Sequence, residues 1–202
     1  ALNLFERSYH LAINDHRSNI SDLEKIEDDS KWPRLYYEYD KLQNLSDELI
    51  SLKPIVNLEN ENAPALLRYE MNLPNQDYHK ELDRIGPLAA EYDYNKGLEY
   101  RKKKDKESQK IAAKAFKSAQ QFVPNYKNSK ELYDETRASA LLTLLILPFD
   151  GNNNLVNYIR DQMMMIQTNK PKEFLQIISR DQLSSTLLEQ KLQLSGMVDN
   201  DQ

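Results

Sequence analysis

The stretch Tyr92–Pro124, which reads YDYNKGLEYRKKKDKESQKIAAKAFKSAQQFVP, decides the fold expected for the chain. Small, aromatic and proline residues recur in it at the spacings of two packed helices: Gly97, Tyr100, Ala112, Phe116, Ala119 and Pro124. The small residues allow two antiparallel helices to approach closely, the aromatic side chains fill the space beside them, and the proline ends the second helix. The stretch therefore predicts a helical hairpin, with its turn in the polar run Arg101–Glu107.

These positions resemble a tetratricopeptide repeat, a helix-turn-helix unit of about 34 residues. The pattern departs from the family in two ways: the interval from Gly97 to Ala112 is longer, and Tyr92 or Tyr94 replaces the usual first aromatic residue. The resemblance implies a mostly α-helical region, over residues 1–140, that presents a surface to a partner protein. The alternative is an ordinary helical hairpin that happens to share these spacings.

Composition excludes several classes of protein. The chain has 202 residues, of which 40% are hydrophobic, so it is long enough to bury a core. A net charge of -5 argues against a nucleic-acid surface. We interpret the short basic run Arg101–Lys104 as a solvated turn, the alternative being a contact with an anion or a lipid headgroup. Cysteine is absent, which excludes disulfides, thiolate nucleophiles and cysteine metal sites. The longest apolar run, residues 138–149, is too short to cross a bilayer.

Two helices are expected before the central stretch. Residues 2–26 predict one long helix or two short ones. A second helix should begin after the capping residues Asp28–Ser30, with Pro33 in its first turn, and end just before Pro54. Its tyrosines, Tyr36, Tyr37 and Tyr39, are more typical of a core than of a ligand groove. Whether these two helices form a true repeat stays open. Their apolar residues keep the spacing of the repeat, but the small residues that the repeat requires are missing.

The segment Pro54–Pro87 holds four of the eight prolines and predicts an irregular excursion with short helical pieces at residues 65–71 and 78–85. His79 and Glu81 share the His-x-Glu spacing of zinc deaminases, but that family also needs two cysteines. No two of the three histidines are four residues apart, so a helical histidine metal pair is excluded.

After the central stretch, Ser129 is expected to cap a helix over residues 130–140. The apolar run Leu141–Phe149 then predicts a buried strand of the kind found in parallel sheets. This strand is followed by a helical face over residues 155–166, a second strand at Phe174–Ser179 and a second helix at Ser184–Leu194. Residues 141–202 therefore predict a small β-α-β-α portion.

This C-terminal portion resembles the opening of the curli secretion component (CsgG-like) domain. The specific part is Ile178–Asp199, in which Ser179-Arg180, Leu188-Glu189-Gln190 and Ser195-Gly196 stand at the positions of the family pattern. The resemblance covers about the last 60 residues and stops where the family continues into further strands. It implies a protein of the bacterial cell envelope, periplasmic and anchored to the outer membrane as a lipoprotein through a segment upstream of this chain.

No catalytic or cofactor-binding constellation is visible in the sequence. Acid–base catalysis needs a desolvated carboxylate or histidine with a partner, and no such set stands out. The stretch Asp150–Asn154 lacks the alternating acidic ligands and the closing glutamate of a calcium loop. Asp199 and Asp201 form a short acidic pair of a kind common in acidic termini. We therefore expect no catalytic, metal or cofactor residues.

The sequence thus predicts a non-enzymatic scaffold or adaptor of the cell envelope that binds partner proteins, including other copies of itself, through helical-repeat surfaces. Two alternatives stay open: a subunit of an oligomeric secretion channel, and an activator that docks on a cell-wall synthesis enzyme. An enzyme is a third, and would need a pocket built from residues that show no motif.

Overall fold

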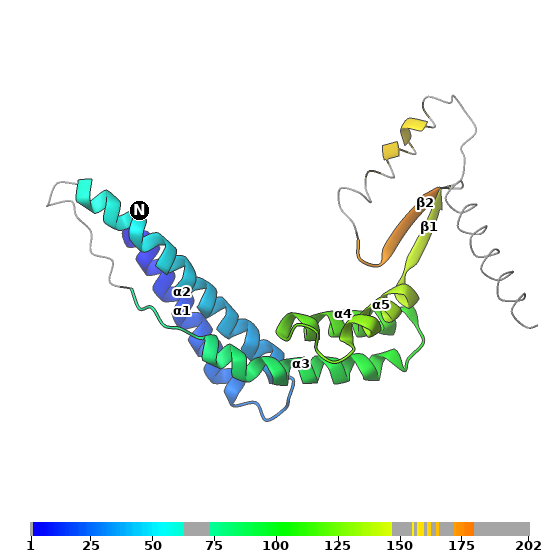
Figure 1. Cartoon of the computed structure of the whole chain (residues 1–202), viewed down its shortest axis with the longest axis horizontal. Coiled ribbons are helices and arrows are strands. Elements are labelled where there is room, and N and C mark those ends of the chain that lie inside the picture. Colours follow the sequence, from blue (N-terminus) through cyan, green and yellow to red (C-terminus); the bar gives the residue numbers. More distant parts are fainter. Residues whose placement is uncertain are drawn as a thin grey trace, which may run out of the picture.

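The structure is a computed structural model that describes residues 2–62, 73–146 and 172–179, together with residues 155, 157–159, 161, 162 and 165. Five helices and two strands are defined in these parts (Figure 1): α1 (Leu2–Glu24), α2 (Lys31–Asn62), α3 (His79–Arg101), α4 (Lys106–Phe122), α5 (Ser129–Ala140), β1 (Leu142–Ile146) and β2 (Leu175–Ser179). The mostly helical fold class predicted from the sequence is confirmed.

The helices form an elongated row in which each packs chiefly against its neighbours in the chain (Figure 1). Helix α3 is the central member, because it spans from the α1–α2 hairpin to the α4–α5 pair. Its first half contributes Ile85 to a core with α1 and α2, and its second half packs Tyr94 and Leu98 against α4 and α5. One helix therefore belongs to both packing units, and Tyr36 of α2 also contacts Phe122 of α4.

The α1–α2 hairpin is closed by large aliphatic side chains. Buried residues recur along both helices at helical spacing: Ile13, Ile20 and Leu23 on α1, and Leu35, Leu42 and Leu49 on α2. The start of α2 matches the prediction, since the carboxylate of Asp28 accepts a hydrogen bond from the Ser30 amide at 2.6 Å. Residues 2–24 form a single helix, which decides between the two alternatives predicted for this segment.

The expected end of α2 at Pro54 is wrong, because the helix continues to Asn62. A proline inside a helix removes one backbone hydrogen bond and costs about 3 kcal/mol or more, yet α2 is helical on both sides of Pro54. Pro54 therefore lowers the stability of the helix at that point without ending it.

The irregular excursion predicted for Pro54–Pro87 is also wrong at its C-terminal end. Helix α3 begins at His79 and passes through Pro87, so the short helical piece expected at residues 78–85 is the first part of a longer helix. Ile85 and Gly86 on one side of the proline, and Ala89 and Ala90 on the other, are all buried. This packing on both sides holds the helix across the proline. The piece expected at residues 65–71 lies outside the described residues.

The α3–α4 hairpin predicted from the central stretch is confirmed. A Cβ atom at Gly97 would lie 2.6 Å from the ring of Phe116, so the two helices meet at a distance that only glycine permits. Ala112, Phe116 and Ala119 are fully buried, and α4 ends at Phe122, two residues before Pro124.

The turn between α3 and α4 is short and internally bonded. It is limited to residues 102–105, inside the predicted run. The Asp105 carboxylate caps α4 by accepting a hydrogen bond from the Ser108 amide at 2.9 Å, and the Gln109 side-chain amide donates to the carbonyl of Lys103 at 2.6 Å.

Helix α5 begins one residue earlier than expected. Asn128 occupies the capping position and Ser129 is the first helical residue, so the predicted cap at Ser129 is wrong. Its hydroxyl instead donates a hydrogen bond to the Tyr126 carbonyl in the preceding turn. That turn places Asn125 and Lys127 at positive φ angles of 57° and 46°.

The two predicted strands are present and pair in parallel, with Leu142 opposite Leu175 and Ile146 opposite Ser179. The expectation that β1 is buried is wrong for its described side chains, since Leu142 and Leu144 are 55% and 45% exposed. In the described residues the sheet has two strands, and this face of β1 has no helix packed on it. Helical residues occur between the strands, at positions 155, 157–159, 161, 162 and 165, whereas the helix expected at Ser184–Leu194 lies outside the described residues.

Glu173, just before β2, ties the strands to the helices. Its carboxylate accepts hydrogen bonds from Lys117 of α4 at 2.9 Å and Tyr133 of α5 at 2.8 Å. Its carbonyl accepts another from the Arg137 side chain at 3.1 Å. The short sheet therefore rests on the C-terminal end of the helical row.

Candidate functional site

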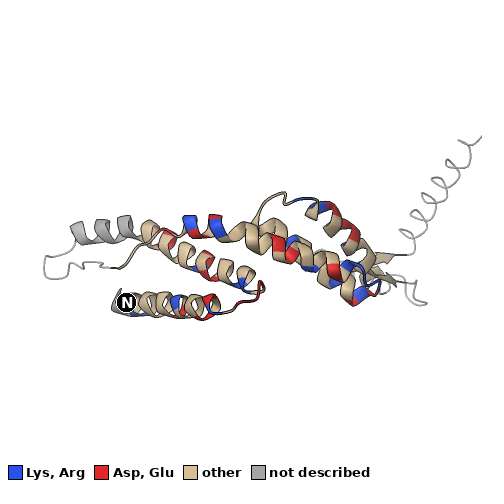
Figure 2. Cartoon of the chain, turned by 90° about the horizontal axis from the view of Figure 1, so that it is seen from below, with Lys and Arg blue, Asp and Glu red and all other residues tan. Residues whose placement is uncertain are grey.

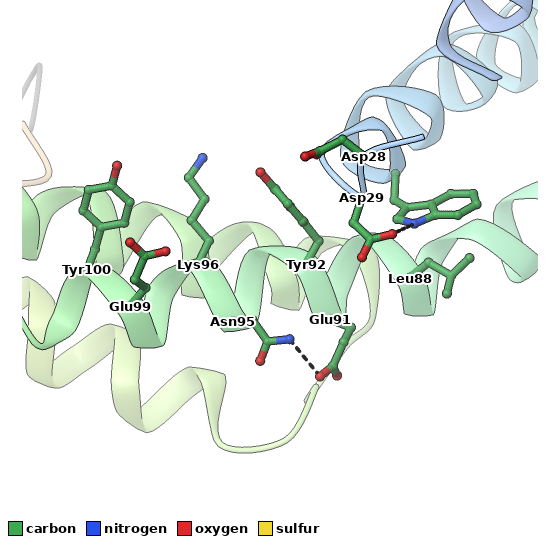
Figure 3. Close-up of a pocket in the computed structure, with 10 residues that line it drawn as sticks. Asp28, Asp29, Leu88, Glu91, Tyr92, Asn95, Lys96, Glu99 and Tyr100 are labelled. Atoms are coloured by element: carbon green, nitrogen blue, oxygen red, sulfur yellow. Dashed lines mark hydrogen bonds between the residues drawn. The ribbon is translucent and has the colours of Figure 1, made fainter. Parts of the chain in front are cut away.

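A groove of about 600 Å³ lies between the turn that joins α1 to α2 and the exposed face of α3 (Figure 3). We call it the α3 groove. The turn contributes Asp28 and Asp29, and α2 contributes Trp32. The α3 side is formed by residues spaced three or four apart, which places them on one helical face: Leu88, Glu91, Tyr92, Asn95, Lys96, Glu99 and Tyr100.

The turn side of the groove is held by local hydrogen bonds. Asp29 accepts a bond from the indole N–H of Trp32 at 3.0 Å, which fixes both side chains (Figure 3). Hydrogen bonds from the Ser30 side chain and from the Ser30 amide keep the pKa of the Asp28 carboxyl below its usual value. Asp28 is therefore ionised at neutral pH. The backbone carbonyls of Asp28 and Asp29 accept the first amides of α2, so the same residues start the helix and line the groove.

The α3 side presents aromatic rings next to charges. Tyr92, Lys96 and Tyr100 project toward the same side of the helix, the side on which Asp28 lies (Figure 3). Burial raises the pKa of Tyr92, with a further contribution from the nearby charge of Asp28, so its hydroxyl stays neutral. Glu99 is exposed, and neither it nor Lys96 forms an ion pair with another described residue. The groove therefore offers exposed charge beside aromatic surface.

Glu91 is committed to holding the fold. It accepts hydrogen bonds from Lys127, from the Tyr126 hydroxyl and from Asn95, the last at 3.1 Å. These bonds, that from Lys127 first, lower the pKa of Glu91 to about 2. Glu91 and Asn95 line one edge of the groove, with their side chains turned away from Tyr92 (Figure 3). Glu91 thus ties α3 to the α4–α5 turn, and Asp28, Asp29 and Glu99 remain as the carboxylates that face an occupant.

The other sequence features considered as sites do not come together. His79 pairs with Asp77 at 2.6 Å on the surface, whereas Glu81 pairs with Arg84 at 3.0 Å. Within the described residues no group of three or more histidine, cysteine or acidic side chains is placed to hold a metal ion. The stretch Asp150–Asn154 and the pair Asp199 and Asp201 lie outside the described residues.

The tyrosines of α2 mainly serve packing. Tyr36 and Tyr37 meet the ring of Phe122 with centroids 4.9 and 5.4 Å apart, and Tyr39 meets Tyr78 at 6.1 Å. This agrees with the core interpretation, although Tyr37 keeps an exposed surface.

The basic run forms an exposed turn, as predicted. Arg101 pairs with Glu135 at 2.8 Å, and Lys103 lies over the ring of Tyr100 at 4.5 Å. Figure 2 shows acidic and basic residues interspersed along the helices, with the turn between α1 and α2 acidic.

Sequence reasoning missed the α3 groove. Asp28 and Asp29 were recognised only as helix-capping residues, and Tyr92 and Tyr100 only as packing residues of a repeat. The available signal was the spacing of Tyr92, Lys96 and Tyr100, which puts three large side chains on one face of α3. What no spacing shows is that the α1–α2 turn lies across that face.

The chain matches no protein-family model, no curated protein and no solved structure. The resemblances to the tetratricopeptide repeat and to the curli secretion component therefore rest on the residues quoted for them. No helix in the described part of the chain is long and apolar enough to span a bilayer.

Proposed function

We propose that the chain is a non-enzymatic helical binding module that holds an extended segment of a partner protein in the α3 groove. The observation that carries the proposal is the presence of Trp32, Tyr92 and Tyr100 in an open groove between two packed units. Aromatic side chains supply much of the binding energy in protein interfaces, because they bury a large area at a low entropy cost.

The groove is suited to binding because its walls are fixed before an occupant arrives. The turn wall is held by the Asp29–Trp32 bond, and the α3 wall by the packing of Gly97 against Phe116 and by the bonds of Glu91 to the α4–α5 turn. A preformed groove loses little conformational entropy on binding. No covalent step is part of the proposal.

The bacterial envelope is the proposed location, with a lipid anchor supplied upstream of this chain. The support is the resemblance carried by Ile178–Asp199, most of which lies outside the described residues, and the parallel pairing of β1 with β2 is compatible with it. A secretion-channel subunit would form a large ring in detergent, and a docking activator would stimulate a cell-wall synthesis enzyme. Mass measurement in detergent and an activation assay separate these two roles from a small adaptor.

A phage-displayed peptide library tests the binding proposal. We expect the full chain to enrich a consistent set of peptides, and Tyr92→Ser to lose them, because this half-buried tyrosine lines the groove with its aromatic ring. Tyr158→Ser is the matched control, since Tyr158 is 61% exposed and lies outside the groove. Failure of the library to enrich any peptide, or equal enrichment by Tyr92→Ser, would overturn the proposed function.

A further inference from the structure

We infer that the α3 groove selects a positively charged segment in which two lysine or arginine residues are about four residues apart in an extended chain. This inference rests on the proposed function and names the class of partner for the same groove. Each end of the groove pairs an aromatic ring with a carboxylate, and the two ends are separated by a lysine.

The first end consists of Tyr92 and Asp28. The two are close enough for the charge of Asp28 to contribute to the raised pKa of Tyr92, and both lie on the same side of α3 (Figure 3). The side chain of a lysine or arginine has an apolar stem and a charged head. The stem would pack on the ring of Tyr92 while the head meets the carboxylate of Asp28.

The second end consists of Tyr100 and Glu99. Glu99 is exposed and has no ion pair with a described residue, so its carboxylate is available to an occupant. The ring of Tyr100 already attracts an ammonium group, that of Lys103 at 4.5 Å. Lys31 lies in the same way over Trp32, at 4.8 Å. Two rings of this groove therefore already hold a lysine of the chain itself, which a basic residue of the partner would replace.

The distance between the two ends sets the spacing of the partner residues. Tyr92 and Tyr100 are eight residues apart on α3, which is about 12 Å at the helical rise. In an extended chain, residues four apart are about 13 Å from each other and point to the same side. An extended segment with basic residues at these two positions matches both ends at once.

Lys96 lies between the two ends and determines which basic segments bind weakly. Its ammonium forms no ion pair with a described residue, and it projects to the same side as both tyrosines (Figure 3). A third basic residue midway between the first two would meet this charge at short range and weaken binding. The groove therefore discriminates against an uninterrupted basic run.

Fluorescence anisotropy with four labelled nine-residue peptides tests the inference. The first peptide has arginine at its third and seventh positions, the second has glutamate there, the third has uncharged residues there, and the fourth adds arginine at the fifth position of the first. We expect the first peptide to bind about tenfold or more tightly than the second, with the third between them. A higher salt concentration should reduce the difference in affinity between the first and the second peptide.

Two variants of the full chain and a control assign the effect to the groove. Glu99→Gln should weaken binding of the first peptide about two- to fivefold, and Lys96→Gln should strengthen binding of the fourth by a similar factor. Glu48→Gln is the matched control, because Glu48 is an exposed residue of α2 outside the groove. It should leave all affinities unchanged.

The outcomes separate the inference from the proposed function. If the library enriches peptides but the glutamate or uncharged peptide binds as well as the first, or Glu99→Gln has no effect, the charge selection is wrong and the binding module stands. If the library enriches nothing, the proposed function fails, and the inference with it.

Discussion

The two helical hairpins of this chain are closed by different means. In the α1–α2 hairpin, leucine and isoleucine side chains fill the space between the helices, whereas in the α3–α4 hairpin Gly97, Ala112 and Ala119 let the backbones approach and one ring, that of Phe116, fills the seam. A seam of aliphatic side chains is sensitive to lost volume, and a close backbone approach is sensitive to added volume. Two hairpins of the same topology are therefore destabilised by opposite changes, the first by lost side-chain volume and the second by added volume.

The largest expected effect comes from removing volume in the first hairpin. Leu42 is almost fully buried on α2, so Leu42→Ala should lower the free energy of unfolding by about 2–5 kcal/mol, through lost transfer energy and a cavity. Urea denaturation followed by circular dichroism measures it. Leu11→Ala is the control, since Leu11 is 55% exposed on α1 and should change stability by less than about 0.5 kcal/mol. Equal effects of the two substitutions would contradict this account of the first seam.

Adding volume in the second hairpin should have the next largest effect. A Cβ at Gly97 meets the Phe116 ring at 2.6 Å, so Gly97→Val should lower the free energy of unfolding by about 1–3 kcal/mol. Gly86 provides a control on the same helix, because a Cβ there meets its nearest atoms at 3.4 and 3.5 Å. Gly86→Ala should change stability by no more than about 1 kcal/mol, the alanine gaining helix propensity. If Gly86→Ala lowered the free energy of unfolding more than Gly97→Val, the close approach of α3 and α4 would not lie at Gly97.

A buried carboxylate gives the second hairpin a pH dependence of its own. Burial of Asp93 on α3 raises the pKa of its carboxyl, although Lys96 and a hydrogen bond from Ser118 oppose the shift. The folded state then holds a proton more tightly than the unfolded state. Stability falls as the pH rises from the unfolded pKa through the raised one, and the loss is complete above it.

Asp93→Asn should therefore be more stable than the original chain at pH 7, and this gain should vanish at pH 3. Urea denaturation at the two pH values measures the difference. If Asp93→Asn raised the free energy of unfolding equally at both pH values, ionisation of the Asp93 carboxyl would not be the cause.

The smallest expected effect concerns the link between α3 and the α4–α5 turn. The pKa of Glu91 is lowered to about 2 by Lys127, Tyr126 and Asn95, so its contribution is present above the unfolded pKa and is lost as the pH falls toward 2. Because its side chain is 45% exposed, solvent screens the interaction, and we expect less than about 1 kcal/mol. Glu91→Gln should flatten the fall in stability between pH 4.5 and 2. If Glu91→Gln left the pH dependence of stability unchanged, other carboxylates would be the cause of the fall in stability at low pH.

Local pattern was sufficient where the chain contacts itself over short distances. The α3–α4 hairpin follows from the spacing of Gly97 and Phe116, the start of α2 from Asp28 and Pro33, and the two parallel strands from their apolar runs. The prolines misled, because a helix was expected to end just before Pro54 and an irregular segment to extend to Pro87. Ile85, Gly86, Ala89 and Ala90 are buried around Pro87, and this tertiary packing holds α3 across the missing hydrogen bond.

The sequence by itself determined the mostly helical class, the hairpin at its centre and the change from helix to strand after Ala140, because these depend on residues close together in the chain. Only the tertiary structure decided that the α1–α2 turn lies across α3, which places Asp28 beside Tyr92, more than sixty residues further along the chain. The physical reason is that side-chain spacing specifies which face of a helix is buried, whereas a groove depends on how two packed units are oriented on a shared helix. For this chain that orientation is set by the passage of α3 from the first core to the second and by the contacts of Tyr36 and Tyr37 with Phe122.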